Sequence, residues 1–172
     1  MSRSGYYAAS PPTLYAFTTA IVRPGGNAVL INPDNSKLRW VSIETAATAR
    51  MAFAIEVAPE ILAVDADSPA LGLRAQGDLA RSLIETGITP VIVASGRPGH
   101  RHVFARISDP ALLLRIKARA RSEHYAEGSK RLDVRYAIRP PLAPHRLGLA
   151  PKLLFPPDVA TALGALRGLD LR

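Results

Sequence analysis

The chain has 172 residues, a formal net charge of +8 and 48% hydrophobic residues, which predicts one domain with a real core and argues against intrinsic disorder or collagen-like repeats. It contains no cysteine, which excludes disulfides, thiolate zinc sites and cysteine nucleophiles, so a bound metal would need carboxylates or histidines. No apolar run approaches the roughly 18–20 residues of a membrane span, and the start lacks the apolar stretch of a signal peptide, so we expect a cytoplasmic protein with no membrane partner.

The first predicted elements are a leader, a hairpin and a helix. Prolines and glycines punctuate residues 1–26 without a sustained period, so we expect a leader there and one domain over 27–172. Two short apolar runs, 28–31 and 38–41, flank a turn-rich stretch and predict a β-hairpin. The Ala-rich stretch 44–57 predicts a helix that stops at Pro59.

The middle of the chain predicts buried strands and a capped helix. The apolar runs 61–64 and 91–94 are typical of buried strands, and residues 102–107 alternate like a strand. Ser68 and Pro69 have the pattern of a helix start, and that helix should run to about Thr86.

The last third predicts two further helices and a third buried run. Asp109 and Pro110 should open a helix that ends near Gly128, residues 132–138 form the apolar run, and 158–169 the terminal helix. Helices and strands mix without strict alternation, so the expected class is α/β or α+β, a single domain around a mixed central β-sheet flanked by helices.

The positive charge is concentrated in one segment. Residues 97–146 hold twelve of the 22 Lys and Arg residues but only four of the 14 acids, which accounts for the whole excess of +8. Such a segment predicts a polyanionic partner such as nucleic acid or nucleotide phosphates. A sequence that uses arginine at every exposed basic position would show the same excess, so the charge leaves both interpretations open.

A pair of acids follows the first buried strand. Asp65 and Asp67 are two residues apart, so in a strand their side chains project from the same face. Adjacent carboxylates repel each other and are stabilised by a cation, and two-metal sites that process phosphates use this arrangement. Asp67 alone has a simpler explanation as a helix-entry residue before Ser68 and Pro69, but this does not account for Asp65.

Two later stretches supply cations and a third acid. A glycine-containing turn from Ser95 to His102 carries Arg97 among its possible phosphate donors, or else is a plain hairpin turn with surface histidines. Asp133 lies inside an apolar run and needs either an arginine or a metal as its partner. The proline-rich stretch that follows supplies further side chains suited to a triphosphate: Arg139, His145 and Arg146.

The order of these motifs over residues 60–147 resembles the archaeo-eukaryotic primase superfamily, especially the primase-polymerase domains of plasmids and phages. In that family a pair of acids spaced by one residue, here Asp65 and Asp67, comes first. A Ser/Gly turn leading to a histidine, here His102, comes second, and a single acid after a hydrophobic residue, here Asp133, comes third. The family often continues with two prolines and a histidine, which Pro140, Pro141 and His145 match.

The resemblance implies an RRM-like catalytic core and template-directed nucleotidyl transfer for primer synthesis or extension in DNA replication. Asp65, Asp67 and Asp133 would bind two Mg²⁺ or Mn²⁺ ions, and His102 would hydrogen-bond the phosphates of an incoming dNTP or NTP. A single-stranded or primed DNA template and a replicative helicase are the implied partners. The residues expected on the triphosphate are Ser95, Arg97, Arg139, His145 and Arg146. Those expected on the template are Arg101, Arg115, Lys117, Arg119 and Arg121.

Two other functions remain open from the sequence. His100 and His102 have the spacing seen in endonucleases that nick single-stranded DNA with a tyrosine, for which Tyr125 is the candidate nucleophile. A non-catalytic module for single-stranded nucleic acid would explain the charge without the acids, and its binding would depend strongly on salt and require no metal.

Overall fold

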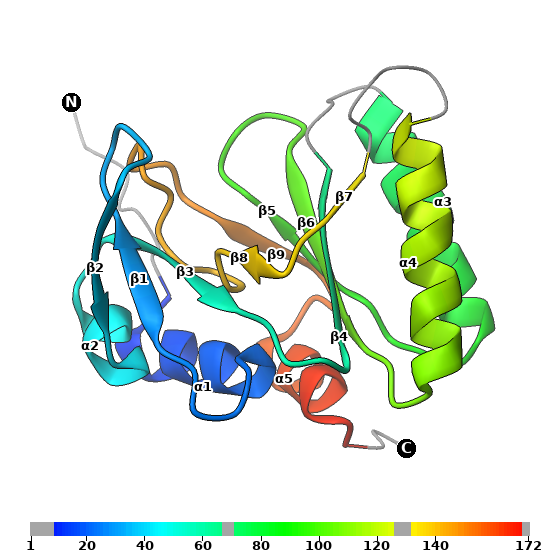
Figure 1. The fold of residues 1–172 in the computed structure, drawn as a ribbon, viewed down its shortest axis with the longest axis horizontal. Helices are drawn as coiled ribbons and strands as arrows, with labels where there is room; N and C mark the ends of the chain where they lie inside the picture. Colours follow the sequence, from blue (N-terminus) through cyan, green and yellow to red (C-terminus); the bar gives the residue numbers. More distant parts are fainter. Residues whose placement is uncertain (1–8, 67–70, 126–131, 170–172) are drawn as a thin grey trace.

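The computed structural model describes residues 9–66, 71–125 and 132–169, in which helices and strands are combined in one body (Figure 1). The mixed α and β class predicted from the sequence is therefore confirmed. The strands do not form the single mixed sheet that was expected, but two sheets whose neighbouring strands all run antiparallel.

The elements follow one another in this order: α1 (Pro11–Ile21), β1 (Ala28–Ile31), β2 (Lys37–Val41), α2 (Ile43–Thr48), β3 (Ala52–Glu56), β4 (Ile61–Ala66), α3 (Leu71–Glu85), β5 (Val91–Ala94), β6 (Arg101–Arg106), α4 (Pro110–Tyr125), β7 (Asp133–Val134), β8 (Ala137–Ile138), β9 (Lys152–Phe155) and α5 (Val159–Arg167). Within the described ranges, no helix combines the length and apolarity needed to cross a membrane.

The smaller sheet has the strand order β2-β1-β3-β8. Its β1–β2 hairpin confirms the predicted one, with Ala28 opposite Val41. The helix expected over 44–57 is wrong for its second half, because α2 ends at Thr48 and β3 pairs with β1 on one side and β8 on the other. The phenylalanine and isoleucine of β3, Phe53 and Ile55, are both buried, so sheet pairing and burial outweigh the helix propensity of the alanines.

Residues 11–21 form α1 rather than part of an extended leader. Ser10 caps this helix by accepting a hydrogen bond from the Thr13 amide, and prolines occupy its first two positions. Leu14, Phe17 and Ile21 are almost fully buried. They pack in the core cluster that also contains residues of the smaller sheet and of α5, so this segment belongs to the domain.

The larger sheet has the order β7-β4-β6-β5-β9 and is covered on both faces. α3 and α4 pack on one face, and α1 and α5 contribute to the cluster on the other (Figure 1). The buried strands predicted at 61–64, 91–94 and 102–107 are confirmed as β4, β5 and β6. The helices predicted to begin near Ser68 and at Asp109 are present as α3 and α4, although Ser68, Pro69 and Gly128 lie outside the described residues.

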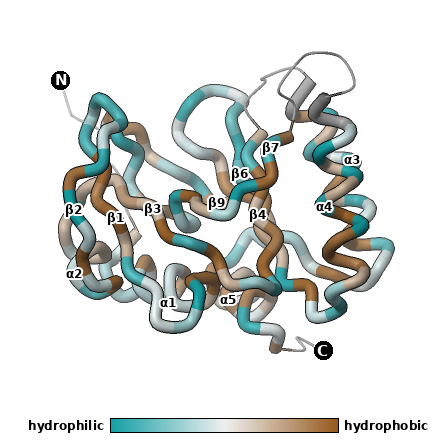
Figure 2. Tube along the Cα trace, viewed as in Figure 1, coloured by the Kyte–Doolittle hydropathy of each residue, from teal (hydrophilic) through white to brown (hydrophobic). Residues whose placement is uncertain are grey.

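The alternation of side chains along β4 positions its acid. Leu62, Val64 and Ala66 point into the cluster under α3 and α4, whereas Ile61 and Ala63 belong to the opposite cluster. β4 is correspondingly coloured as hydrophobic over most of its length in Figure 2. Asp65 continues the face of Ile61 and Ala63 and projects toward the smaller sheet rather than under the helices.

The apolar run 132–138 is divided between the two sheets. β7 pairs with β4, and two residues later β8 pairs with β3. Arg135 and Tyr136 form the link, and the Tyr136 carbonyl accepts a hydrogen bond from the Val57 amide at 3.0 Å. This short link brings the larger sheet's edge beside the smaller sheet and closes one side of the space between them.

Candidate functional site

A cavity of about 330 Å³ lies between the two sheets. Its lining is strongly basic: of the described residues around it, four are arginines and three are histidines, against the single carboxylate of Asp65. The lining residues are Ile31, Asn35, Ala52, Phe53, Ala54, Asp65, Ser95, Arg97, His100, His102, Arg135, Ala137, Ile138, Arg139, His145 and Arg146. His102 and the five residues expected on the triphosphate therefore all surround one space, which has the size of a small-ligand site.

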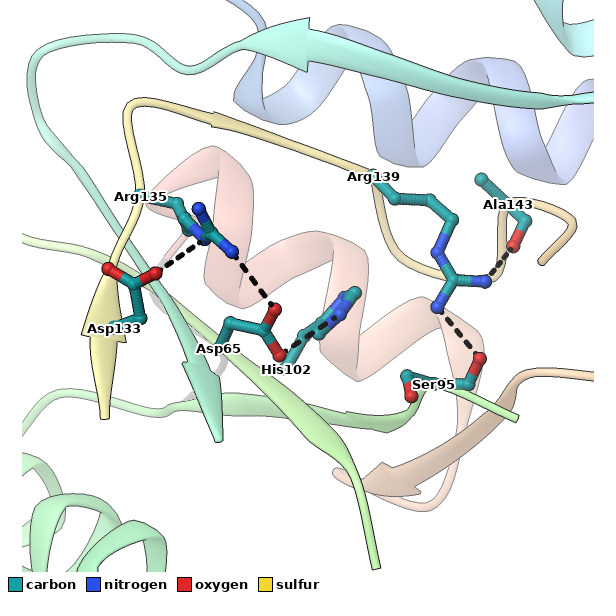
Figure 3. A network of polar contacts seen from close by, with 7 residues as sticks. All are labelled: Asp65, Ser95, His102, Asp133, Arg135, Arg139 and Ala143. Atoms are coloured by element: carbon teal, nitrogen blue, oxygen red, sulfur yellow. Dashed lines mark hydrogen bonds and ion pairs between the residues drawn. The ribbon is translucent and has the colours of Figure 1, made fainter. Parts of the chain in front are cut away.

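Three of the predicted site residues form a row across adjacent strands. Asp65 on β4 is directly opposite His102 on β6 and directly opposite Asp133 on β7. Directly opposed residues have Cβ atoms roughly 4.5–5.5 Å apart and share a face. The two acids and the histidine therefore meet at one level of the sheet (Figure 3), and Asp65 and His102 line the cavity.

Arg135 is the cation that holds the two acids in this structure. Its Nε lies 3.0 Å from Asp133 Oδ2, and its terminal nitrogen lies 3.8 Å from Asp65 Oδ2 (Figure 3). Of the two partners expected for Asp133, an arginine or a metal, the structure has an arginine. The guanidinium is partly exposed, so water and a competing cation can reach it.

His102 is buried and uncharged at neutral pH. Burial, reinforced by the nearby charges of Arg139 and Arg135, lowers the pKa of His102 to about 3. Its Nε2 lies 3.5 Å from Asp65 Oδ1, and its ring meets Phe104 edge-on. The imidazole is therefore a fixed, neutral hydrogen-bonding group at the cavity border.

Arg139 fixes the wall of the cavity opposite the acids. Its two terminal nitrogens donate to the Ser95 carbonyl at 2.7 Å and the Ala143 carbonyl at 3.3 Å (Figure 3). Burial lowers the pKa of Arg139 to about 10, and the Arg97 charge acts in the same direction. Arg139 thus remains charged while its guanidinium ties the end of β5 to the proline-rich segment.

The segment after β8 brings two more groups to the cavity. Arg146 donates to the Pro33 carbonyl in the β1–β2 turn, which joins this segment to the smaller sheet. The ring nitrogen Nδ1 of His145 accepts from the Leu147 amide at 3.1 Å. Partial burial, followed by the charges of Arg139 and Arg97, lowers the pKa of His145 to about 4, so positive charge in the cavity already disfavours further protons.

The first glycine of the turn after β5, Gly96, is required for close packing. Gly96 has a φ of +103°, and a Cβ placed there would approach Leu149 Cβ to 2.7 Å. The missing side chain of Gly96 therefore makes room for Leu149, not for a phosphate. The amide of Ser95 bonds the His100 carbonyl at 3.0 Å, which closes the turn and sets Arg97 at the cavity.

The residues expected on a template lie elsewhere and in three different directions. Arg101 donates to the buried Gln76 side chain of α3 at 3.0 Å, on the face of the sheet opposite to His102. Lys117 and Arg121 point from α4 to Tyr136. Arg115 and Arg119 lie roughly 200° around the axis of α4 from Lys117, so the four basic residues of this helix do not form one face.

A metal at the acids stays a prediction. Asp67 lies outside the described residues, so the expected set of three carboxylates is represented by Asp65 and Asp133. Over the described part of the chain, no group of three His, Asp or Glu side chains has the arrangement of a metal site. The two carboxylates that do converge are the groups that would hold a divalent cation.

Several cavity residues were not predicted from the sequence. Ile31, Ala52 and Ala54 form an apolar side on the smaller sheet, and their role depends on how the two sheets are placed, which no local pattern indicates. Arg135 is not among the site residues expected from the sequence. Its position two residues after an acid in an apolar run was the available signal.

Comparison with known proteins adds no family assignment: neither a family model nor a curated protein matches this sequence.

The two depressed histidine pKa values predict a loss of stability in mild acid. The unfolded chain takes up protons at histidine near pH 6.5, whereas folded His102 and His145 take them up only near 3 and 4. The free energy of unfolding should therefore be highest above about pH 6.5 and fall as the pH decreases toward 5. His102 should contribute about 2 kcal/mol to this fall, and the more exposed His145 less.

Urea unfolding at pH 7.0, 6.0 and 5.0 measures this effect above the range in which carboxylates titrate. The His145→Asn variant should show a shallower fall than the wild type, and His102→Gln a shallower fall still. A wild-type free energy of unfolding that stays constant from pH 7 to 5 would show that these histidines are free to protonate.

Proposed function

We propose that this protein is a metal-dependent nucleotidyl transferase that synthesises or extends primers on a DNA template from dNTPs or NTPs, as in primase-polymerases. One observation carries the proposal: Asp133, Asp65 and His102 stand in one row on three adjacent strands, and Asp65 and His102 line a cavity that four arginines also line. Acids that can hold a metal ion thus lie beside arginines that can hold phosphate. A metal-bound nucleoside triphosphate would use both kinds of group.

Different residues of the cavity would contact different parts of such a ligand. Arg97, Arg139 and Arg146 would take the phosphate charge, for which guanidinium groups are well suited. The neutral imidazole of His102 would hydrogen-bond a phosphate oxygen without adding to the crowded positive charge. The apolar side formed by Ile31, Ala52 and Ala54 would adjoin the nucleoside.

The acids would act through divalent cations. Mg²⁺ or Mn²⁺ held by Asp65 and Asp133, with Asp67 as the resemblance implies, would activate the 3′-hydroxyl and stabilise the pyrophosphate that leaves. Asp65 is held between His102 and Arg135, which orients its carboxylate before a ligand arrives. This preorganisation supports rapid assembly of the site.

The test is a primer-extension assay with the purified chain on a primed DNA template, with Mg²⁺ and Mn²⁺ compared and dNTP and NTP pools kept separate. We expect a product that lengthens only when metal and nucleotide are both present. A second reaction without primer distinguishes initiation from extension. No lengthening under any of these conditions would refute the proposal.

Arg135 is expected to compete with the metal. The Arg135→Gln substitution removes the guanidinium that contacts both carboxylates, so the Mn²⁺ concentration for half-maximal binding should fall about fivefold, as for a partly exposed ion pair of about 1 kcal/mol. Calorimetric titration with Mn²⁺ measures this shift. Arg81→Gln is the matched control, since Arg81 pairs with Asp78 at 3.6 Å on α3 and neither residue lines the cavity.

A non-catalytic module for single-stranded nucleic acid is the second candidate, and the Arg135 contacts favour it because they satisfy the acids without a metal. It predicts oligonucleotide binding that is unchanged by EDTA. A nicking endonuclease stays a prediction from the sequence, because the side chain of its candidate nucleophile, Tyr125, lies outside what the structure describes.

A further inference from the structure

Tyr136 is a fixed aromatic side chain that faces solvent. It occupies the link between β7 and β8, where its carbonyl accepts from the Val57 amide at 3.0 Å. Its residue surface is 65% exposed. The ring is therefore held in place and available for contact.

Two cations of α4 gather at this ring. Lys117 Nζ lies 5.5 Å from the ring centroid, and the guanidinium carbon of Arg121 lies 5.8 Å from it. Arg121 also donates to the Tyr136 hydroxyl at 2.6 Å. We call Tyr136, Lys117 and Arg121 the tyrosine patch; it combines a π surface with two positive charges.

The tyrosine patch lies next to the cavity. Arg135 and Ala137, the residues on either side of Tyr136, both line that cavity. β7 forms the edge of the larger sheet, so a chain molecule bound at the patch needs only to pass this edge to reach Asp133 and Asp65.

The chemistry of the tyrosine patch matches single-stranded nucleic acid. An unpaired base offers a π face that stacks on an aromatic ring, and the phosphate beside it pairs with lysine or arginine. Duplex DNA satisfies only the second contact, because its bases are already stacked on one another. An acidic peptide also satisfies only the charges.

We infer that the tyrosine patch stacks one base of a single-stranded nucleic acid and holds its phosphates with Lys117 and Arg121. This inference deepens the proposed function by giving the template strand a place beside the cavity. Binding at the patch requires neither metal nor nucleotide, so it can be measured separately from catalysis.

The experiment is fluorescence anisotropy of a labelled 15-residue oligothymidylate with the full chain in EDTA and without nucleotide. Tyr136→Leu should weaken binding roughly 5- to 50-fold, as for the loss of one stacked base, while Tyr136→Phe keeps the affinity within about twofold. Binding of a duplex of equal length should respond to neither change. Tyr15→Leu, at an exposed tyrosine of α1, is the matched control and should bind like the wild type.

The contribution of the positive charges is tested with one substitution on each side of α4. Lys117→Gln should reduce the slope of log Kd against log salt by about 0.7, whereas Arg115→Gln on the other side should leave the slope unchanged. Three results would each overturn the stacking site. The first is an equal effect of these two substitutions, and the second is a wild-type affinity in Tyr136→Leu. The third is a loss of affinity in Tyr136→Phe as large as in Tyr136→Leu. Circular dichroism confirms that each variant folds.

Failure here and failure of the proposed function are distinguishable. If the protein binds the oligonucleotide through Tyr136 but never extends a primer, the stacking site is supported and the polymerase proposal is refuted. If the wild type extends primers and the Tyr136→Leu variant binds and extends normally, the polymerase proposal is supported and the stacking site is refuted.

Discussion

Replacement of Asp65 by asparagine is expected to lower the rate of nucleotide incorporation by about 10²–10³-fold without unfolding the protein. Asparagine keeps the shape of the side chain and its hydrogen-bonding capacity, but it removes the charge that faces Asp133 and His102 across neighbouring strands. Asp133→Asn should have an effect of the same size, because the two carboxylates act at one place. Single-turnover primer extension with Mn²⁺ measures both.

The control for this prediction is an acid with no part in the cavity. Asp78 lies on α3 and pairs with Arg81 at 3.6 Å, so Asp78→Asn should extend primers at the wild-type rate. Thermal melting shows whether each variant is folded under assay conditions. A folded Asp65→Asn variant that retains incorporation within tenfold of the wild type would contradict the assignment of the acids.

Arg139→Lys should raise the KM for the incoming nucleotide by roughly 10–100-fold and change kcat much less. Lysine keeps the positive charge but loses the planar fork with which Arg139 bonds the Ser95 and Ala143 carbonyls. The cation would then be free to leave its position at the cavity wall. Steady-state extension over a range of nucleotide concentrations separates the two constants.

A purely structural role for Arg139 gives a different result. In that case the melting temperature of Arg139→Lys falls while the KM of the remaining folded protein stays at the wild-type value. Arg106→Lys is a useful comparison, because Arg106 also bonds two carbonyls, those of Leu166 and Ala20, at the other end of β6. It should lower stability and leave the KM unchanged.

The candidate site could be predicted largely because strands impose a simple geometry. Asp65, His102 and Asp133 each lie in or beside an apolar run, and alternation along a strand fixes the face to which each side chain points. The structure places all three on one face of one sheet. Their meeting at one level depends on strand register, which spacing along the chain does not contain.

The errors come from segments whose conformation is decided by distant partners. Residues 52–56 have alanines that favour a helix, yet β1 and β8 on either side draw them into a sheet. The run 132–138 looked like one strand, but its two ends bond different sheets. Arg101 stays a prediction for nucleic acid, and in the structure the alternation from His102 turns it toward Gln76 of α3.

The link of Arg135 and Tyr136 has a mechanical consequence. It is one of the places where the chain passes between the sheets, and the hydrogen bond from Val57 ties it to another such crossing, the connection from β3 to β4. A tilt of one sheet against the other would therefore strain these joined crossings, together with the segment that leads from β8 to β9. We expect such a tilt to alter the width of the cavity, the contact of Arg135 with the acids and the orientation of the Tyr136 ring together.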